Sequence, residues 1–370
     1  MSDNQHLGLY IHVPFCRSKC SYCGFFSLPF AAELCELWLQ HLFVEFDRRI
    51  EAEKIQRVRT AFIGGGNPTV LPLAQFTAFV DGLQRRLEPS PIKEWTFETN
   101  PETFTREHLA VLRSVSGLRL SFGLQRLRDD ELTRIGRQAH ASCGLRALEQ
   151  AFSTITNVGA DFILGVPGLP SLAGDLDLLL HRFPLTHVST YFLTAEPNTP
   201  LAREIENGRF PDPAECGPEE LFEVRAALER HGLQQYEISN FALPGRECLH
   251  NLHYWYQGDY IGIGPAAVST LDGIRTANPE GLEQWINGEH QIERLSPIDQ
   301  RREYLMLRLR LLREGFSPID YASRFGIGVN ELVQQLDTLV DRGDLTRTPE
   351  GYALSISGMS VANRIISELF

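Results

Sequence analysis

Three cysteines lie close together near the start of the chain, in the segment HVPFCRSKCSYCGF. Cys16, Cys20 and Cys23 follow a C-x3-C-x2-C pattern, which puts three thiols on one short loop. Iron–sulfur clusters are normally held by four cysteines, and the bacterial ferredoxin run has a different spacing. Structural zinc sites use paired C-x2-C motifs, which this segment lacks. The pattern predicts a [4Fe-4S] cluster with one iron open to a small molecule.

Composition limits the class of protein. The chain has 370 residues, 43% of them hydrophobic, with a net charge of −12. No run of about 18 apolar residues predicts a membrane span, and the start MSDNQHLGLY lacks the features of a secretion signal. Seven cysteines, an odd number with three clustered, favour a reducing compartment and a metal over disulfides. The negative charge disfavours a nucleic-acid partner. These features predict a cytoplasmic metalloprotein.

Apolar segments of strand length alternate with amphipathic helical segments through the first half of the chain. Helices are expected near 31–54 and 72–87. The expected strands are 7–13, 60–65, 94–99, 117–123, 158–165 and 186–193. Alternating strands and helices indicate parallel βαβ units. The sequence predicts an α/β fold with a partial (β/α)6 TIM-like barrel. An open doubly wound sheet is the alternative.

The pattern changes after about residue 235. Residues 236–295 are rich in aromatics and glycine and are expected to form short strands and loops that connect two domains. Residues 296–370 follow with helices, a short hairpin and a final helix, which predicts a C-terminal winged-helix-like α+β domain. Residues 290–370 carry ten Lys/Arg against eleven Asp/Glu, so this domain is expected to pack on the barrel rather than bind DNA.

Polar and glycine residues lie near the ends of several predicted strands or directly after them. They include the segment Gly64–Asn67 and the side chains of Glu98, Gln125 and Asp161. Barrel enzymes build their sites at this face from the loops after the strands. Each residue also has an ordinary alternative: a tight turn, a surface acid, a loop hydrogen bond or a cap. Position alone does not decide between these roles.

The motifs YIHVPFC, CSYC, GGGNP, SFGLQ and YEISNFALPG, with Asp161, extend over most of the chain. Together they resemble the oxygen-independent coproporphyrinogen III oxidase (HemN-like) family of the radical S-adenosylmethionine (SAM) superfamily. The resemblance implies that SAM binds the fourth iron. It also implies one-electron reduction of the sulfonium to methionine and a 5′-deoxyadenosyl radical. Residues 1–235 would then form the radical SAM core.

The resemblance also implies which residues contact SAM. Those expected to contact the cluster-bound SAM are Tyr10, Gly65 and Glu98. Those expected to line a second SAM or substrate position are Tyr22, Gly66, Asn67, Gln125, Arg137 and Asp161. The family usually has Thr where this chain has Asn67.

Two features of the sequence distinguish between the subgroups of this family. Coproporphyrinogen dehydrogenases of the family carry a fourth cysteine where this chain has Phe25, and they have a longer segment before Tyr10. The segment HNLHYW matches the H-N-x-x-Y-W motif of the HemW-type haem chaperones. The implied haem-binding residues are His250, Asn251, Tyr254 and Trp255. Imidazole is a common haem ligand and the aromatic rings offer apolar surface; His253 is an alternative ligand.

The sequence therefore predicts a protein that binds a [4Fe-4S] cluster, SAM and haem and delivers haem to acceptor proteins. The resemblance implies respiratory enzymes as acceptors and flavodoxin or ferredoxin as the electron donor. The alternatives are a coproporphyrinogen III oxidase and a radical SAM methyltransferase, so the residues leave open whether the protein is an enzyme. Because the barrel site and segment 250–255 are distant in sequence, the two binding functions are expected to be separable by mutation.

Overall fold

A curved sheet forms the centre of the molecule. The computed structural model describes residues 6–53 and 58–369. Within them, twelve strands form one sheet in the order β14-β13-β12-β11-β1-β4-β5-β6-β7-β8-β10-β9. Its central parallel strands are β1 (Leu7–Val13), β4 (Val58–Gly65), β5 (Glu94–Thr99), β6 (Leu118–Gln125), β7 (Val158–Leu164) and β8 (His187–Phe192). These six strands confirm the predicted partial barrel.

The sheet continues at both ends. β11 (Tyr260–Ile263) runs parallel to β1, and three antiparallel strands follow it: β12 (Val268–Leu271), β13 (Ile274–Ala277) and β14 (Gln291–Arg294). At the other end lie the antiparallel strands β10 (Asn240–Ala242) and β9 (Gln234–Gln235). The strand β11 therefore brings residues near 260 beside the first strand of the chain.

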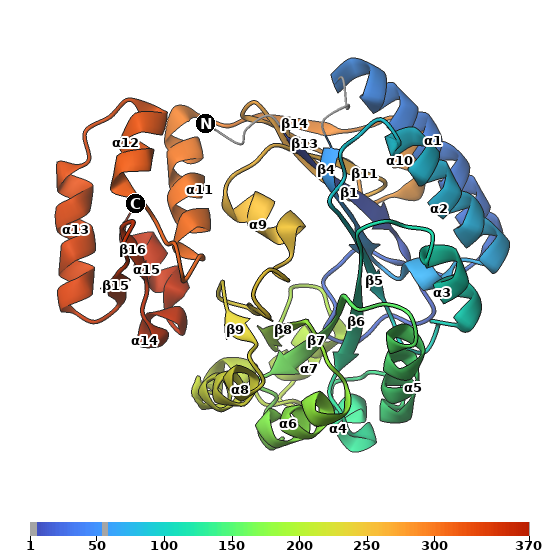
Figure 1. The fold of residues 1–370 in the computed structure, drawn as a ribbon, viewed down its shortest axis with the longest axis horizontal. Helices are drawn as coiled ribbons and strands as arrows, with labels where there is room; N and C mark the ends of the chain where they lie inside the picture. The colour runs from blue at the N-terminus through green and yellow to red at the C-terminus, as the bar shows by residue number, and fades with distance from the viewer. Residues whose placement is uncertain (1–5, 54–57, 370) are drawn as a thin grey trace.

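Helices cover the outer, convex side of the sheet, as Figure 1 shows along its right and lower edges. They are α1 (Ala32–Glu53), α2 (Leu73–Leu87), α3 (Arg106–Leu112), α4 (Asp129–Arg134), α5 (Ala141–Phe152), α6 (Ala173–Arg182) and α8 (Glu219–Arg230). The short helix α7 (Pro200–Glu206) instead starts beside the segment 16–23, where the backbone N–H of Leu201 donates to the carbonyl of Ser21 at 2.9 Å. The indole of Trp38 on α1 packs 5.4 Å from the ring of Phe79 on α2 and is fully buried. The central strands are buried at most of their positions and contain the aromatic and β-branched residues that are common in strands, which explains why the sequence located them well.

The connecting segment contains a helix that the sequence analysis missed. Residues Leu249–Trp255 form α9, whereas short strands and loops were predicted there, so that prediction is wrong for this stretch. No side chain at the start of α9 caps it. Instead, the carboxylate of Glu94 accepts hydrogen bonds from the backbone N–H groups of Leu249 (3.0 Å) and His250 (3.1 Å). A cap supplied from a distant strand leaves no local sequence signal. A further short helix, α10 (Leu282–Ile286), follows β13.

The end of the chain packs around a second apolar core, which includes Tyr304, Phe316, Leu336 and Ile365. Its elements are α11 (Pro297–Leu309), α12 (Pro318–Phe325), α13 (Asn330–Asp341), β15 (Leu345–Arg347), β16 (Tyr352–Leu354), α14 (Ile356–Met359) and α15 (Ala362–Glu368). Three helices followed by a hairpin match the predicted winged-helix-like order. The domain boundaries after 235 and 295 stay predictions. In Figure 1, α9 lies between this C-terminal lobe and the sheet. None of the described helices has the length and apolar character needed to span a membrane.

Candidate functional site

The cysteine loop follows β1 and is closed by a short parallel pair, β2 (Phe15–Cys16) with β3 (Leu28–Pro29). The thiols of Cys16, Cys20 and Cys23 are partly exposed and form no disulfide. Burial raises the pKa of the Cys16 thiol to about 11, and the neighbouring Cys23 and Cys20 add to the rise. The three sulfurs thus lie within electrostatic reach of one another. This donor set fits a cluster whose metal ions displace the thiol protons.

Arg137 connects the cysteine loop to the strand ends. Its buried guanidinium donates from Nη1 to the Sγ of Cys20 at 3.5 Å. The other terminal nitrogen donates to Asn100 Oδ1 at 3.0 Å and to the carbonyl of Gly123 at 3.1 Å. A fixed cation beside a thiol favours the thiolate form that metals bind. Arg137 therefore lies against the predicted cluster loop, in contact with one of its thiols.

Tyr10, in the middle of β1, comes together with Gly65 and Glu98 at the ends of β4 and β5. Gly65 has φ +95°, and a Cβ there would lie 2.3 Å from Nδ1 of His12, so glycine is required. Its backbone N–H donates to Glu98 Oε2 at 3.3 Å. The hydroxyl of Tyr10 and His12 Nδ1 are 3.0 Å apart, while His12 Nε2 donates to the carbonyl of Phe26 at 3.0 Å. All three predicted SAM contacts thus lie at one place, as the resemblance implied.

Two carboxyl groups face the interior of the barrel. Burial, and next the charge of Asp161, raises the pKa of Glu98 to about 7. Burial also raises the pKa of Asp161, although its carboxylate accepts a hydrogen bond from Ser121 Oγ at 3.1 Å. A ligand with hydroxyl donors would compensate the lost hydration of these oxygens.

Asn67 has a structural role in this molecule. Its side chain is buried and donates from Nδ2 to Thr103 Oγ1 at 2.7 Å. The side-chain oxygen accepts from the backbone N–H of Thr69 (3.2 Å) and of Asn100 (3.3 Å). Because its amide nitrogen and oxygen already have protein partners, Asn67 joins the loops after β4 and β5 rather than pointing at a ligand.

The remaining residues of the predicted second position are spread along the same face. Gln125 ends β6 with φ +67°, where the β6–β7 register shifts. Tyr22 packs against a small apolar cluster that includes Ile135 and Leu193. A Cβ on Gly66 would lie 2.5 Å from the carbonyl of Val13. Gly66 is thus explained by the close approach of the backbone and Tyr22 by packing, whereas the left-handed backbone at Gln125 does not by itself explain a glutamine.

The predicted haem residues lie on α9, and His250 is buried there with both ring nitrogens engaged. Nδ1 is 2.8 Å from the hydroxyl of Thr60, and Nε2 is 3.0 Å from the hydroxyl of Tyr254. Burial lowers the pKa of His250 to about 3, so the ring is neutral. His253 Nε2 donates to the carbonyl of Asp259 at 2.6 Å. Ligation of iron by Nε2 of His250 would therefore require the contact with Tyr254 to open.

One cavity of about 670 Å³ joins the two predicted sites. Tyr10, Gly65 and Glu98 line it together with the α9 residues His250, Asn251, Tyr254 and Trp255. Between them lies Phe62, whose ring stacks on His250 with centroids 5.2 Å apart. The parallel pairing of β1 with β11 explains how residues 240 positions apart meet. The two predicted sites therefore share walls. That their binding functions are separable by mutation stays a prediction.

Sequence reasoning missed several residues of this cavity. The C-terminal lobe supplies part of one wall, and β13 supplies a cation; these residues are Arg275, Gln300, Glu303, Met306, Leu307 and Arg324. Arg275 is held by Glu303 at 2.6 Å. The buried residues Thr60 and Glu94, which hold His250 and the start of α9, were also missed. Nothing local in the sequence marks them, because each acts on a segment far along the chain.

Comparison with known proteins gives concordant results. Residues 10–171 match the family model of the Radical SAM superfamily. The chain is 32% identical to the Heme chaperone HemW of Escherichia coli, with 98% of each chain covered. It is 31% identical to the Heme chaperone HemW of Bacillus subtilis over 96% of this chain and 97% of that one. The chain belongs to the HemW family of radical SAM proteins.

This chain shares its fold with a known enzyme. The solved structure of coproporphyrinogen III oxidase (HemN) from Escherichia coli superposes on this HemW-family chain with a TM-score of 0.80 and 20% identity. The alignment covers 99% of this chain and 90% of that one. This similarity confirms the expected fold, including the C-terminal lobe. Phe25, at the position where a fourth cysteine would mark a coproporphyrinogen dehydrogenase, is 66% exposed and lines the cavity.

Proposed function

We propose that this protein is a haem chaperone of the HemW type: it binds a [4Fe-4S] cluster, SAM and haem and delivers the haem to acceptor proteins. The observation that carries the proposal is the shared cavity. It places Tyr10, Gly65 and Glu98 in one space with His250, Tyr254 and Trp255. A volume of about 670 Å³ is within the usual range for cofactor sites.

The cluster would be held by Cys16, Cys20 and Cys23, with Arg137 offsetting negative charge beside Cys20. When bound, such a cluster supplies an electron and an open iron to SAM. The protein's own contribution is positioning. Gly65 lets the backbone come close to the ligand, and the carboxyl of Glu98 can accept hydrogen bonds from ribose hydroxyls.

Haem would lie against α9. Trp255 and Tyr254 offer aromatic surface there, and the buried indole N–H of Trp255 has no acceptor among the described residues. A bound carboxylate would satisfy that donor. The His250 ring is neutral, as an iron ligand must be, and release of Nε2 by Tyr254 would make it available. Asn251 lines the same wall.

The proposal includes partners. The relatives of this chain are named heme chaperones. We therefore infer that its partners are haem-acceptor proteins, with respiratory enzymes as the expected class. The cluster requires an electron donor such as flavodoxin or ferredoxin. The cysteine usage, with three thiols left free for a metal, supports a cytoplasmic location.

The test is anaerobic reconstitution followed by two assays on one sample. Haem titration should give a saturable absorption band, while coproporphyrinogen III should not be converted. Addition of SAM should change the electron paramagnetic resonance spectrum of the reduced cluster. A sample that binds no haem but converts coproporphyrinogen III would overturn the chaperone function in favour of the oxidase.

A further inference from the structure

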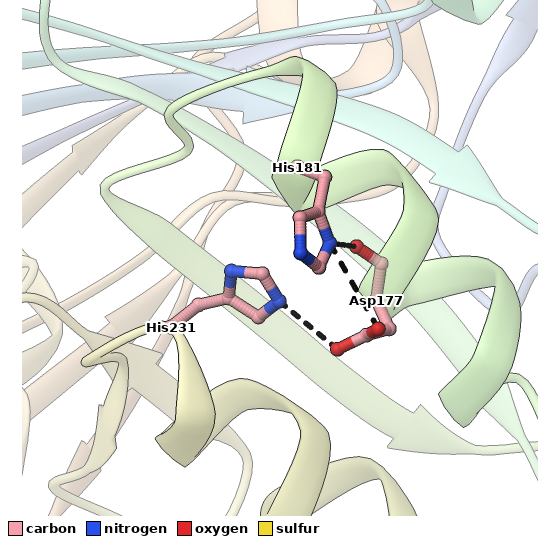
Figure 2. A group of neighbouring side chains, drawn as sticks. All are labelled: Asp177, His181 and His231. Atoms are coloured by element: carbon pink, nitrogen blue, oxygen red, sulfur yellow. Dashed lines mark hydrogen bonds and ion pairs between the residues drawn. The ribbon is translucent and has the colours of Figure 1, made fainter.

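Two histidines and an aspartate converge on the outer surface of the barrel, on residues that the cavity does not use. Asp177 and His181 lie one turn apart on α6, and His231 directly follows α8. The two helices lie side by side in Figure 1, below the sheet. Figure 2 shows the three side chains pointing toward one another across the gap between them.

The donor atoms are close enough to share one ion. One ligand atom from each of the three residues lies within 4.8 Å of the other two. His231 Nε2 is 3.0 Å from Asp177 Oδ1, and His181 Nδ1 is 3.8 Å from Asp177 Oδ2. The two imidazole rings meet edge to face, with centroids 4.7 Å apart. The spacing arises from the i, i+4 geometry of α6 and the packing of α8 beside it.

The donor set suits a borderline metal ion. Two imidazole nitrogens and one carboxylate oxygen are ligands of Zn²⁺, which commonly takes three protein ligands and leaves one position to water. His181 Nδ1 donates to the carbonyl of Asp177 at 2.7 Å, so Nε2 carries the lone pair of the neutral ring. His231 is mostly buried and His181 mostly exposed, with exposed side-chain fractions of 19% and 69%. An ion could therefore enter from the His181 side.

Arg230 is a nearby cation that pairs with this group, and its position is compatible with an ion. Its Nη2 donates to Asp177 Oδ1 at 3.2 Å. That leaves Oδ2, the oxygen nearer His181, for coordination. Carboxylates that bind metals are commonly oriented by a second hydrogen bond of this kind. The hydrogen bond from His231, and next the bond from Arg230, lowers the pKa of Asp177, so its carboxylate is ionised at neutral pH.

We propose that Asp177, His181 and His231 form a binding site for a divalent transition-metal ion of the Zn²⁺ class, joining α6 to α8. The ion binds the Nε2 lone pair of His231, and the proton of that ring then lies on Nδ1. The site is distinct from the cysteine loop, and neither depends on the other. Binding of the ion stabilises the folded chain by linkage, because the unfolded chain does not hold the three residues together.

The experiment uses the anaerobic, cluster-loaded protein and Zn²⁺ as the probe. Calorimetric titration should give one zinc equivalent for the natural chain, and saturating Zn²⁺ should raise its Tm. His231→Ala and His181→Ala should each weaken binding at least about tenfold, the scale seen when metal-site partners are removed. Iron content, measured on every sample, should be unchanged in both variants.

His140 provides a matched control. It is an exposed histidine paired with one aspartate, Asp129, at 3.1 Å, and Asp177, His181 and His231 are the only such three-residue group in the described ranges 6–53 and 58–369. His140→Ala should bind zinc as the natural chain does. Equal zinc binding by the His181→Ala, His231→Ala double variant and the natural chain would overturn the proposal. The proposal would also be overturned if His140→Ala lost as much zinc affinity as the His181→Ala and His231→Ala variants. That result would mean that zinc adsorbs to the surface without specificity.

Discussion

The backbone N–H of His250 donates a hydrogen bond to the carboxylate of Glu94 over 3.1 Å, although 156 positions separate the two residues. Glu94 also accepts from the N–H of Leu249 at 3.0 Å. One buried carboxylate on β5 thus caps α9 and fixes the helix that carries the H-N-x-x-Y-W motif.

Glu94→Gln should therefore destabilise the protein. The amide keeps the size of the side chain but loses the charge, and hydrogen bonds to charged groups contribute about 1.5–3 kcal/mol. We expect the free energy of unfolding, measured by chemical denaturation, to fall by about 1–2 kcal/mol. Glu107→Gln is a suitable control because that acid is exposed in the first turn of α3. Equal stability of the Glu94→Gln variant and the natural chain would contradict this role.

Replacement of any one of Cys16, Cys20 and Cys23 by Ala should remove the iron–sulfur cluster. Cys143→Ala is the matched control, because its thiol is also free and partly exposed. The Cys248→Ala variant should also retain the iron of the cluster, because Cys248 is buried beside Glu94 and outside the cysteine loop. The measurement is iron and sulfide content after anaerobic reconstitution. Full iron content in Cys20→Ala would contradict the cluster assignment.

Glu98 should make the protein less stable as the pH rises. Its pKa is raised from 4.5 to about 7 in the folded state, so between these values the folded chain binds more protons than the unfolded chain. Stability from this group is then highest below pH 4.5 and is lost as the pH approaches 7. Glu98→Gln removes the effect. Between pH 4.5 and pH 7.5 the variant should gain about 3 kcal/mol relative to the natural chain, as measured by denaturation without SAM. If the difference in unfolding free energy between Glu98→Gln and the natural chain did not change with pH, the raised pKa of Glu98 would be contradicted.

Tyr254→Phe should test the role of His250 in haem binding. The phenyl ring keeps the aromatic surface but removes the hydroxyl that lies 3.0 Å from Nε2 of His250. If His250 binds the iron, haem affinity should rise by up to about tenfold, the equivalent of one net hydrogen bond. His250→Ala should lose or shift the haem absorption band while iron in the cluster stays. An unchanged band in His250→Ala would leave His253 as the ligand to test.

SAM and haem should affect each other's binding, because their predicted contacts line one cavity. Haem affinity measured with and without saturating SAM should differ by about fivefold or more, and haem should change SAM affinity by the same factor. Phe62→Ala, which removes the ring between Tyr10 and His250, should reduce this coupling. Identical haem affinity with and without SAM would show that the ligands bind independently.

The strands could be predicted from the sequence because they are buried on both faces. Residues 7–13 and 94–99 were located to the residue, since short segments rich in aromatic and β-branched residues between turn segments are typical of strands. The cysteine triplet and the clustering of Tyr10, Gly65 and Glu98 followed from motifs at the ends of such strands. For these parts, local pattern and fold agree.

The α9 region could not be predicted for a physical reason. Its cap comes from Glu94, and the partner of its histidine is Thr60, so both contacts depend on how β4 and β5 pair in the folded sheet. Asn67 illustrates the same point: its neighbours Thr103 and Asn100 decide that the side chain is structural. Long-range partners of this kind are visible only in three dimensions.

The wall that α11 and α12 give to the cavity has a consequence for the order of assembly. Gln300, Met306, Leu307 and Arg324 are made after every strand of the barrel and after α9. During synthesis, the sheet and the cysteine loop can therefore form while this side of the cavity is still open to water. Docking of the last lobe then adds this wall, so the cavity is completed by the part of the chain that is made last.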